Sequence, residues 1–313
     1  MKLLDATAEG VFIICVTPFT NTGELDMSSA RTMVEFYLEH GATGLTLLGM
    51  MGEAAKLTTD ESLAFVEVVL TQVAGRVPVV VGVSGAGLAP MAQLSEAVMA
   101  AGAAGVMVAP PSHLRSDQQI RGYFLQVGAA LGNTTPLVLQ DFPLATGVTL
   151  SPQTIMQIVA DNPNCVMLKH EDWPGLNKLA QLRAAQAGGT MRKISILVGN
   201  GGIFLPEELA RGADGAMTGF GYPEMMAQVI VAWQAGKHTR ARDLFDAYLP
   251  LARYEQQPGF GLAVRKYILA QRGAIATATL RAPAPALSSA DIADIEALIA
   301  RQTRRLQELN QWT

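Results

Sequence analysis

The sequence contains few residues that could form disulfides or hold a metal. Its 313 residues include 2 cysteines, Cys15 and Cys165, each inside an apolar run, and 4 histidines that lie far apart. Two cysteines cannot build a disulfide framework, and neither residue type shows the paired spacing of a zinc site. We therefore expect two reduced core cysteines and no bound metal.

Charged residues are also scarce, at 16% of the chain. The formal net charge is −4, and the 23 Lys and Arg residues are spread out, so the chain has no basic stripe that could bind a phosphate backbone. No glycine-rich loop has the spacing of a dinucleotide-binding or Walker motif. These absences argue against nucleic acid as a partner and against any cofactor apart from the protein's own side chains.

Long apolar runs are missing as well. Gly, Ala, Pro and Ser dilute the uncharged stretch between Glu96 and Arg115, which therefore differs from the roughly 20 strongly apolar residues of a membrane span. Asp5 and Glu9 lie where a signal peptide would carry its apolar segment. We expect a cytoplasmic protein that does not enter a membrane.

What the sequence does contain is a regular alternation of short β-branched runs and longer amphipathic stretches. The runs are apolar throughout, which is typical of parallel strands buried on both faces. Helical patterns such as Ser28–His40 and Thr58–Val73 lie between them, the second with Thr59 or Asp60 as its expected N-cap. The predicted strands are Val11–Val16, Gly44–Leu48, Pro78–Val83, Gly105–Ala109, Pro136–Leu139, Cys165–Leu168, Ser195–Val198 and Gly215–Thr218.

A weak internal repeat supports this pattern. The motif Gly-Ala-x-Gly occurs at residues 41–44, 102–105 and 212–215, each time directly before an apolar strand. The first glycine can end a helix in the left-handed conformation, and the second allows a close approach to the next strand. Chance is the alternative, because Gly and Ala are abundant here. Eight βα units predict an α/β fold of the (β/α)8 TIM barrel type.

The pattern after the eighth strand is purely helical. We predict that residues 1–235 form the barrel and contain the active site, and that residues 236–313 form a C-terminal helical extension packed on the barrel. The extension is too short for a large core of its own and could carry subunit contacts. Its helices are expected within 224–234, 238–253, 261–271 and 290–309.

Lys169 stands out among the polar residues at the strand ends, where barrel active sites lie. It is the one lysine that directly continues an apolar strand, residues 165–168. Apolar surroundings favour the neutral amine, which can attack a carbonyl and form a Schiff base. The alternative is a side chain that extends out of the strand end or pairs with Glu171 or Asp172.

Several motifs in chain order resemble the dihydrodipicolinate synthase and N-acetylneuraminate lyase family. They are VTPF at Val16–Phe19, GxxGE within Gly49–Leu57, FPLATG after the fifth strand, and Lys169. The resemblance covers about residues 8–235. It implies a (β/α)8 barrel, usually a homotetramer, whose strand-six lysine forms a Schiff base with pyruvate or another 2-oxo acid. Lys169 matches that lysine.

The chain departs from the family pattern at four functional points. Met50 and Met51 replace a Thr or Ser pair that holds the substrate carboxylate, so that backbone amides remain there but hydroxyls do not. Gln140 aligns with the catalytic tyrosine and cannot titrate. Ser112 aligns with a second tyrosine, and Ala145 aligns with an arginine that grips a second substrate.

Other positions keep the resemblance and point to one branch of the family. Gly199 matches a glycine that lines the 2-oxo acid pocket. The turn that it opens, residues 199–202, could hold a carboxylate on its amides, and a plain turn is the alternative. The pair Gln140-Asp141 and the segment at residues 217–224 resemble the branch that dehydrates 2-keto-3-deoxy sugar acids. In that branch the imine acidifies C3 and water leaves C4. We assign Met217, in this segment, to substrate binding. Tyr222, in the loop after the eighth strand, is expected either to reach the mouth of the pocket or to have a packing role.

Some group must still move protons in place of the tyrosine. Strand alternation puts Glu171 on the face of Lys169, roughly 6.5 Å along the strand, which makes Glu171 the candidate acid or base. The alternative for Glu171 is a first-turn charge of the next helix. His113 and Asp141 are second choices, whereas His170 is expected to point outward in a structural role.

These residues lead to one main hypothesis and two alternatives. The first is a Schiff-base lyase in which Lys169, Gln140 and Glu171 are catalytic and Met50, Met51, Gly199, Met217 and Ser112 bind a small 2-oxo acid such as pyruvate, in aldol condensation or cleavage. The second is dehydration of a 2-keto-3-deoxy sugar acid. The third is a barrel that binds a metabolite without turnover. A homo-oligomer, tetramer or dimer, is expected in each case.

Overall fold

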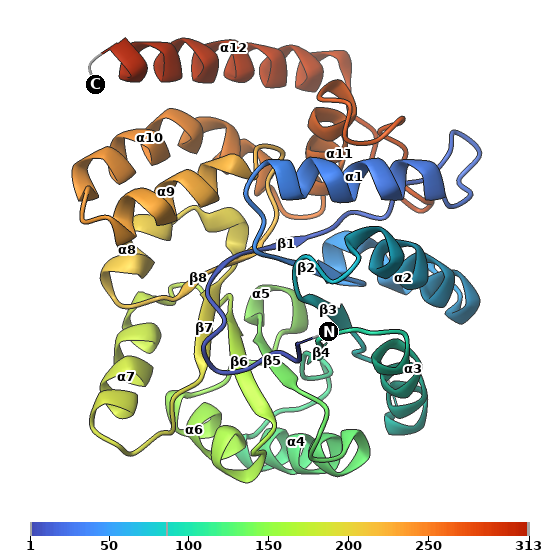
Figure 1. The fold of residues 1–313 in the computed structure, drawn as a ribbon, viewed down its shortest axis with the longest axis vertical. Helices are drawn as coiled ribbons and strands as arrows, with labels where there is room; N and C mark the ends of the chain where they lie inside the picture. The colour runs from blue at the N-terminus through green and yellow to red at the C-terminus, as the bar shows by residue number, and fades with distance from the viewer. Residues whose placement is uncertain (1, 86, 312–313) are drawn as a thin grey trace.

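The computed structural model describes residues 2–85 and 87–311, and within them eight parallel strands close into a barrel. Each strand pairs with its neighbours in chain order, and β8 returns to pair with β1, which confirms the predicted (β/α)8 fold. Figure 1 shows the strands surrounded by the helices that connect them. The strands are β1 (Gly10–Ile14), β2 (Gly44–Leu47), β3 (Val79–Gly82), β4 (Gly105–Val108), β5 (Leu137–Asp141), β6 (Cys165–His170), β7 (Ser195–Val198) and β8 (Gly215–Thr218).

The helices follow the expected order. Short turns interrupt the loops after β2, β5 and β7, at η1 (Met50–Gly52), η2 (Ala54–Lys56), α5 (Pro143–Thr146) and η3 (Asn200–Gly202). The outer layer consists of α1 (Met27–Glu39), α2 (Thr59–Val73), α3 (Leu88–Ala100), α4 (Asp117–Leu131), α6 (Pro152–Asp161), α7 (Leu176–Ala187) and α8 (Leu205–Ala210). The segment after β8 forms α9 (Glu224–Gln234), α10 (His238–Glu255), α11 (Gly261–Gln271) and α12 (Ser289–Gln311).

Two strands extend further than their apolar runs. β5 and β6 each continue two residues beyond the predicted ends, so that Gln140 pairs in register with Lys169 and Asp141 with His170. The ladder continues because each strand offers backbone partners to the other, whatever the side chains are. The polar residues are therefore held by the sheet.

One predicted helix start was wrong. The N-cap of α2 is Thr58, one residue before the expected positions, and its side chain accepts from the backbone N–H of Glu61 at 3.2 Å. The Glu61 carboxylate accepts from the backbone N–H of Thr58 in return, at 2.9 Å. This reciprocal capping box satisfies two backbone donors at once, which a cap at Thr59 or Asp60 would not do.

The Gly-Ala-x-Gly repeat forms the same helix-to-strand turn each time. Gly41, Gly102 and Gly212 have φ values of +89°, +105° and +89°, in the region that favours glycine. The last glycine of the third copy, Gly215, lies so close to β1 that an added Cβ would be 2.0 Å from the carbonyl oxygen of Gly10. The repeat is therefore a structural device of the barrel.

Apolar side chains pack in two layers, one inside the barrel and one between the barrel and the helices. Cys15 and Cys165 are both buried and unpaired, as expected, and burial raises the pKa of the Cys165 thiol to about 11. Such a thiol is inert as a nucleophile. The inner layer consists of Leu4, Phe12, Ile14, Val80, Ala104, Met107, Val138, Met167, Leu197 and Met217.

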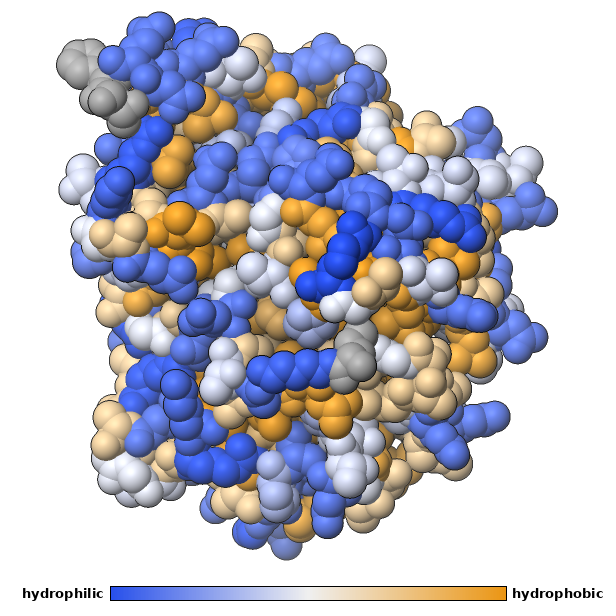
Figure 2. All heavy atoms as spheres, viewed as in Figure 1, coloured by the Kyte–Doolittle hydropathy of each residue, from blue (hydrophilic) through white to orange (hydrophobic). Residues whose placement is uncertain are grey.

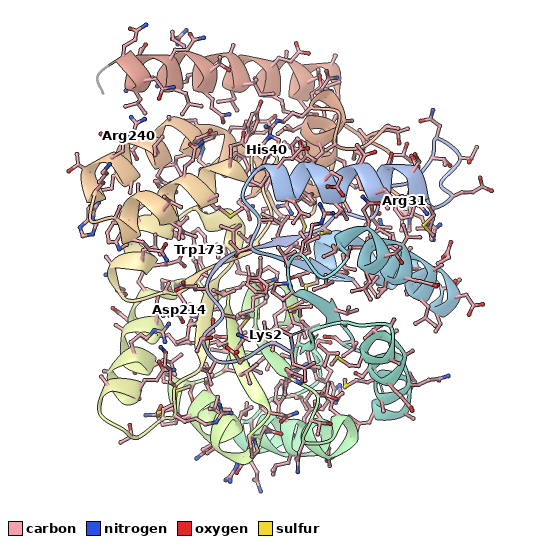
Figure 3. The ribbon with its side chains drawn as sticks, viewed as in Figure 1. Lys2, Arg31, His40, Trp173, Asp214 and Arg240 are labelled. Atoms are coloured by element: carbon pink, nitrogen blue, oxygen red, sulfur yellow. The ribbon has the colours of Figure 1, made fainter. Side chains whose placement is uncertain are left out.

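The helices after β8 cover one side of the barrel (Figure 1), with α10 against α9 and α12 against α10. Arg240 of α10, which is labelled in Figure 3, donates to the carbonyl oxygen of Leu309 in α12 at 3.1 Å. Hydrophilic side chains are interspersed with apolar ones over the face shown in Figure 2. Among the described helices, none combines the length and apolar character needed to cross a membrane.

A buried carboxyl in α8 gives the fold a pH dependence. The Glu208 side chain is 8% exposed, and burial raises its pKa from 4.5 to about 8. The folded protein therefore keeps a proton that the unfolded chain releases, and stability falls as the pH rises from about 4.5 to about 8. We expect Glu208→Gln to raise the free energy of unfolding at pH 8.5 by on the order of 3 kcal/mol.

Urea unfolding of the variant and the natural protein at pH 5 and pH 8.5 would measure this effect. The gain should shrink toward pH 5, because that pH lies only just above the ordinary pKa of 4.5, so the unfolded chain gains little by releasing the proton that the folded protein keeps. Glu67→Gln, at an exposed position of α2, is the matched control and should change little at either pH. An equal gain at both pH values would contradict the assignment to Glu208 ionisation.

Candidate active site

A small cavity lies at the carboxyl end of the barrel, the end where barrel enzymes bind their substrates. Its volume is about 90 Å³. The wall combines strand ends of β1, β5, β6 and β8 with the turns η1 and η3, with Gln256 directly after α10 and with Arg265 of α11. The lining residues are Ile14, Met50, Met51, Gln140, Phe142, Lys169, Glu171, Asn200, Gly201, Thr218, Gly219, Gln256 and Arg265.

Three of the expected catalytic residues meet in this cavity. Lys169 is 4% exposed, and its Nζ lies 2.9 Å from Oε2 of Glu171. The side-chain amide of Gln140 donates to the same carboxylate oxygen at 2.8 Å. Glu171 thus shares the face of Lys169, as strand alternation predicts. The pairing with Glu171, weighed above as an alternative for Lys169, is present as well.

This arrangement lets a proton pass between two side chains without water. The Lys169 ammonium can transfer a proton to Glu171, which leaves a neutral amine facing the cavity and a carboxylic acid beside it. Gln140 cannot titrate, but its N–H group holds the accepting oxygen in place. Of Gln140 and Glu171, only the carboxylate can therefore give or take a proton beside Lys169.

Gly199 is placed behind Glu171. A Cβ at position 199 would lie 2.1 Å from Cγ of Glu171, so only glycine leaves room for this side chain. Asn200 donates from its side chain to the carbonyl oxygen of Glu171 at 3.1 Å, which fixes the backbone at the same point. Gly199 was expected to hold the substrate itself, whereas in the structure it positions Glu171.

Met50 and Met51 line the cavity from η1, as expected. Hydrogen bonds from Thr17 and Lys266 hold the loop that carries them. Thr17 of the VTPF motif donates to the carbonyl oxygen of Gly52 at 2.5 Å. Glu53 is 4% exposed and accepts from Nζ of Lys266 at 2.6 Å. Burial lowers the pKa of Lys266 to about 8. Residues after β8 therefore hold the loop after β2.

Other expected site residues lie elsewhere. Ser112 and His113 are exposed in the loop after β4. Met217 packs in the apolar layer inside the barrel, one residue below Thr218, which lines the cavity in its place. Tyr222 packs under the Arg272 guanidinium, with 4.2 Å between that group and the ring centre. None of these four side chains is part of the described cavity wall.

Asp141 and His170 face away from the cavity because each alternates with a residue that lines it. Asp141 is fully buried and accepts from Nζ of Lys178 at 2.8 Å. The His170 ring lies 3.6 Å from the same carboxylate and contacts the carbonyl oxygen of Gly175 at 3.0 Å. His170 thus has the outward placement predicted for it, whereas Asp141 is not within the wall as an acid or base.

Sequence reasoning missed Arg265, which comes from α11. Its Nε donates to Oε1 of Glu255 at 2.6 Å, and its Nη2 donates to the carbonyl oxygen of Gly219 at 2.6 Å. Burial raises the pKa of the Glu255 carboxyl. The signal in the sequence is the pair Arg265-Lys266 inside an otherwise largely apolar helix, where two adjacent cations are out of place unless they are partnered.

Within residues 2–85 and 87–311, no group of three or more His, Cys, Asp or Glu side chains is arranged to hold a metal ion.

Comparison with known proteins agrees with the fold. Residues 7–302 match the model of the Dihydrodipicolinate synthetase family. The chain belongs to this family. As a member of this family, it is a lyase of the class I aldolase type.

Relatives in the family carry two kinds of names. The chain is 32% identical to L-2-keto-3-deoxyarabonate dehydratase of Azospirillum brasilense over 296 residues, 93% of this chain and 94% of the relative. It is 34% identical to 4-hydroxy-tetrahydrodipicolinate synthase of Thermus thermophilus over 231 residues, 73% and 75% of the two chains. These relatives of the chain thus include one named as a dehydratase and one named as a synthase.

Solved structures of the family superimpose closely. A dihydrodipicolinate synthase from Rhodopseudomonas palustris has a TM-score of 0.94 and 46% identity, and the match covers 96% of this chain and 100% of that one. The Escherichia coli K12 prophage protein YagE, solved in complex with pyruvate, has a TM-score of 0.85 and 25% identity, with 94% and 98% covered.

Proposed function

We propose that the protein dehydrates a 2-keto-3-deoxy sugar acid through a Schiff base on Lys169. The observation that carries the proposal is the buried carboxylate of Glu171, 2.9 Å from Nζ of Lys169 and held there by Gln140. The dehydratase from Azospirillum brasilense, similar over 93% of this chain, supports the same reaction class.

The first step forms the imine. Glu171 takes a proton from Lys169, and the neutral amine attacks the C2 carbonyl of the substrate. The carbinolamine then loses its hydroxyl as water, with a proton returned from Glu171, and a C=N bond joins Lys169 to C2. The proximity of the carboxylate to Nζ lets one side chain serve both proton transfers.

The second step removes water from the substrate. The imine withdraws electrons from C3, so the Glu171 carboxylate can take a C3 proton and leave an enamine. The C4–O bond then breaks, and the hydroxyl leaves as water with the proton that Glu171 carries. Hydrolysis of the imine returns the Lys169 amine and releases the dehydrated 2-oxo acid.

Aldol condensation or cleavage that involves pyruvate is the second candidate. The pyruvate complex of the related prophage protein and the synthases among the relatives favour it. Against it, Gln140 and Ala145 replace groups that the resemblance assigns to condensation, and the described cavity wall contains no tyrosine.

We further propose that the protein works in the cytoplasm as a homo-oligomer, dimer or tetramer, and that it uses no cofactor beyond the covalent imine. The family match supports a small 2-oxo acid as its substrate class.

A substrate comparison tests the proposed function. The purified protein is incubated with 2-keto-3-deoxyarabonate, with pyruvate alone, and with pyruvate plus aspartate semialdehyde, and products are followed by mass spectrometry. We expect loss of one water from the sugar acid and no condensation product. Condensation without dehydration would favour the second candidate, and binding without any turnover would favour a metabolite-binding barrel.

Gly199→Ala should impair the reaction without removing any functional group. The added methyl would force Cγ of Glu171 away from its position, so the carboxylate would leave the neighbourhood of Nζ. We expect kcat to fall by about 10²-fold or more, because misplacement of a general acid or base loses most of its contribution.

Steady-state assays of Gly199→Ala, with thermal unfolding to check stability, would measure this loss. Gly122→Ala is the matched control, because a Cβ at that position in α4 meets nothing within 4 Å. A Gly199→Ala variant that retains full kcat would show that the position of Glu171 does not matter.

A further inference from the structure

One amino group of the Arg265 guanidinium, Nη1, has no hydrogen-bond partner among the described residues. The side chain is 2% exposed, and Glu255 and the Gly219 carbonyl oxygen satisfy Nε and Nη2. Nη1 itself is buried. A buried donor without an acceptor costs free energy, more so on a charged group. An oxygen-bearing ligand would remove that cost.

The Nη1 group of Arg265 lies at the cavity. Arg265 and Gly219 are both part of the wall, and a Cβ on Gly219 would lie 2.3 Å from Nη1. The Nη1 group therefore lies directly against the backbone of Gly219, just after the end of β8. Glycine at position 219 leaves the room that the guanidinium needs there.

Charge identifies the ligand group. The described wall contains two cations, Lys169 and Arg265, and each is paired with one carboxylate, Glu171 or Glu255. In the proposed reaction Lys169 bonds to C2 of the substrate and is used in the chemistry. Arg265 is then the cation left in the wall for the fixed negative charge of the substrate, its C1 carboxylate, and a guanidinium matches a carboxylate in shape.

We propose that Arg265 binds the C1 carboxylate of the substrate through Nη1, in addition to the backbone amides of Met50 and Met51 in the same wall, to which the family resemblance assigns this group. The proposal rests on the proposed function, because it takes the ligand to be a 2-oxo acid held at C2 by Lys169. It makes α11 part of the substrate site, although this helix lies outside the eight βα units. Glu255 acts as a positioning residue, since it holds Nε while Nη1 remains available.

The test compares a charged probe with an uncharged one. Pyruvate and methyl pyruvate share the C2 carbonyl, but only pyruvate has a carboxylate. Each is titrated against the protein, the imine is reduced with borohydride, and the fraction of protein that carries the adduct is read by mass. The natural protein should give half-maximal trapping at a much lower concentration of pyruvate than of the ester.

Two variants remove the contact in different ways. Gly219→Ala displaces Nη1 but leaves the pair with Glu255, and Arg265→Met combined with Glu255→Gln removes both charges together, so that no buried carboxylate is left alone. For either variant we expect the half-maximal concentration of pyruvate to rise about ten- to a hundredfold. The value for methyl pyruvate should change less than about threefold.

Arg272→Met is the matched control. Arg272 follows α11 and pairs with Glu224, but it does not belong to the described cavity wall, so the preference for pyruvate should remain. Circular dichroism and thermal unfolding show which variants are folded, and only folded variants are scored.

The outcomes separate this proposal from the proposed function. A natural protein that traps pyruvate, together with folded variants that keep its preference for pyruvate over the ester, would overturn the role of Arg265 alone. An equal rise for pyruvate and the ester in both variants would also overturn it, because the effect would then be structural. No adduct from any 2-oxo acid with the natural protein would overturn the proposed function and this inference with it.

Discussion

Lys169→Ala should abolish both the covalent adduct and turnover. The natural protein, incubated with a 2-oxo acid and reduced with borohydride, should gain the mass of one substrate less one oxygen atom, located on the peptide that contains Lys169. Alanine has no amine, so the imine cannot form and the C3 proton is no longer acidified. We expect kcat to fall by roughly 10⁴-fold or more, several kcal/mol of barrier height.

Two controls make this result specific. Lys193→Ala removes an exposed lysine at a different point of the chain and should leave the adduct and turnover unchanged. Thermal unfolding of Lys169→Ala checks that loss of the ammonium beside the buried Glu171 carboxylate has not unfolded the protein. A folded Lys169→Ala variant that still forms the adduct or turns over substrate would contradict the imine mechanism.

Glu171→Gln should separate imine formation from the proton transfers that follow. Glutamine keeps the shape of the side chain and can still accept the hydrogen bond from Gln140, but it cannot take a proton from C3. General acid or base catalysis contributes about 10² to 10⁴ in rate, so kcat should fall by that factor. The adduct on Lys169 should still accumulate under borohydride, more slowly than in the natural protein.

The combination of a retained adduct and lost turnover is the diagnostic result. Asp172→Asn is the matched control, because Asp172 is the adjacent carboxylate but pairs with Lys178 and does not line the cavity. The control should retain most of the activity. If Glu171→Gln kept full kcat and an unchanged pH profile, another group or a water molecule would have to carry the proton.

Much of the site could be predicted where it depends on local patterns. Glu171 was placed beside Lys169 because alternation along one strand decides which residues share a face, and the two side chains do meet. Gln140 and Lys169 meet because β5 and β6 are neighbours in register. The same local rule put His170 on the outer face.

Residues whose position depends on loop paths were harder to place. Ser112 was assigned through the resemblance, but the loop after β4 carries it to the surface. Met217 lies one step deeper along β8 than the residue that reaches the cavity. Gly199 is close to the site for a reason that sequence reasoning did not find, since it makes room for Glu171.

By itself, the sequence determined the barrel, the order of its strands, and the lysine at the end of β6, because each follows from periodicity and from turns between neighbouring segments. Only the tertiary structure decided that α11 reaches the cavity, where Arg265 is part of the wall and Lys266 holds the loop after β2 through Glu53. Arg265 contacts Gly219, 46 residues away, and Lys266 contacts Glu53, 213 residues away. Such contacts leave no periodic trace in the sequence, because they arise only when distant segments pack together.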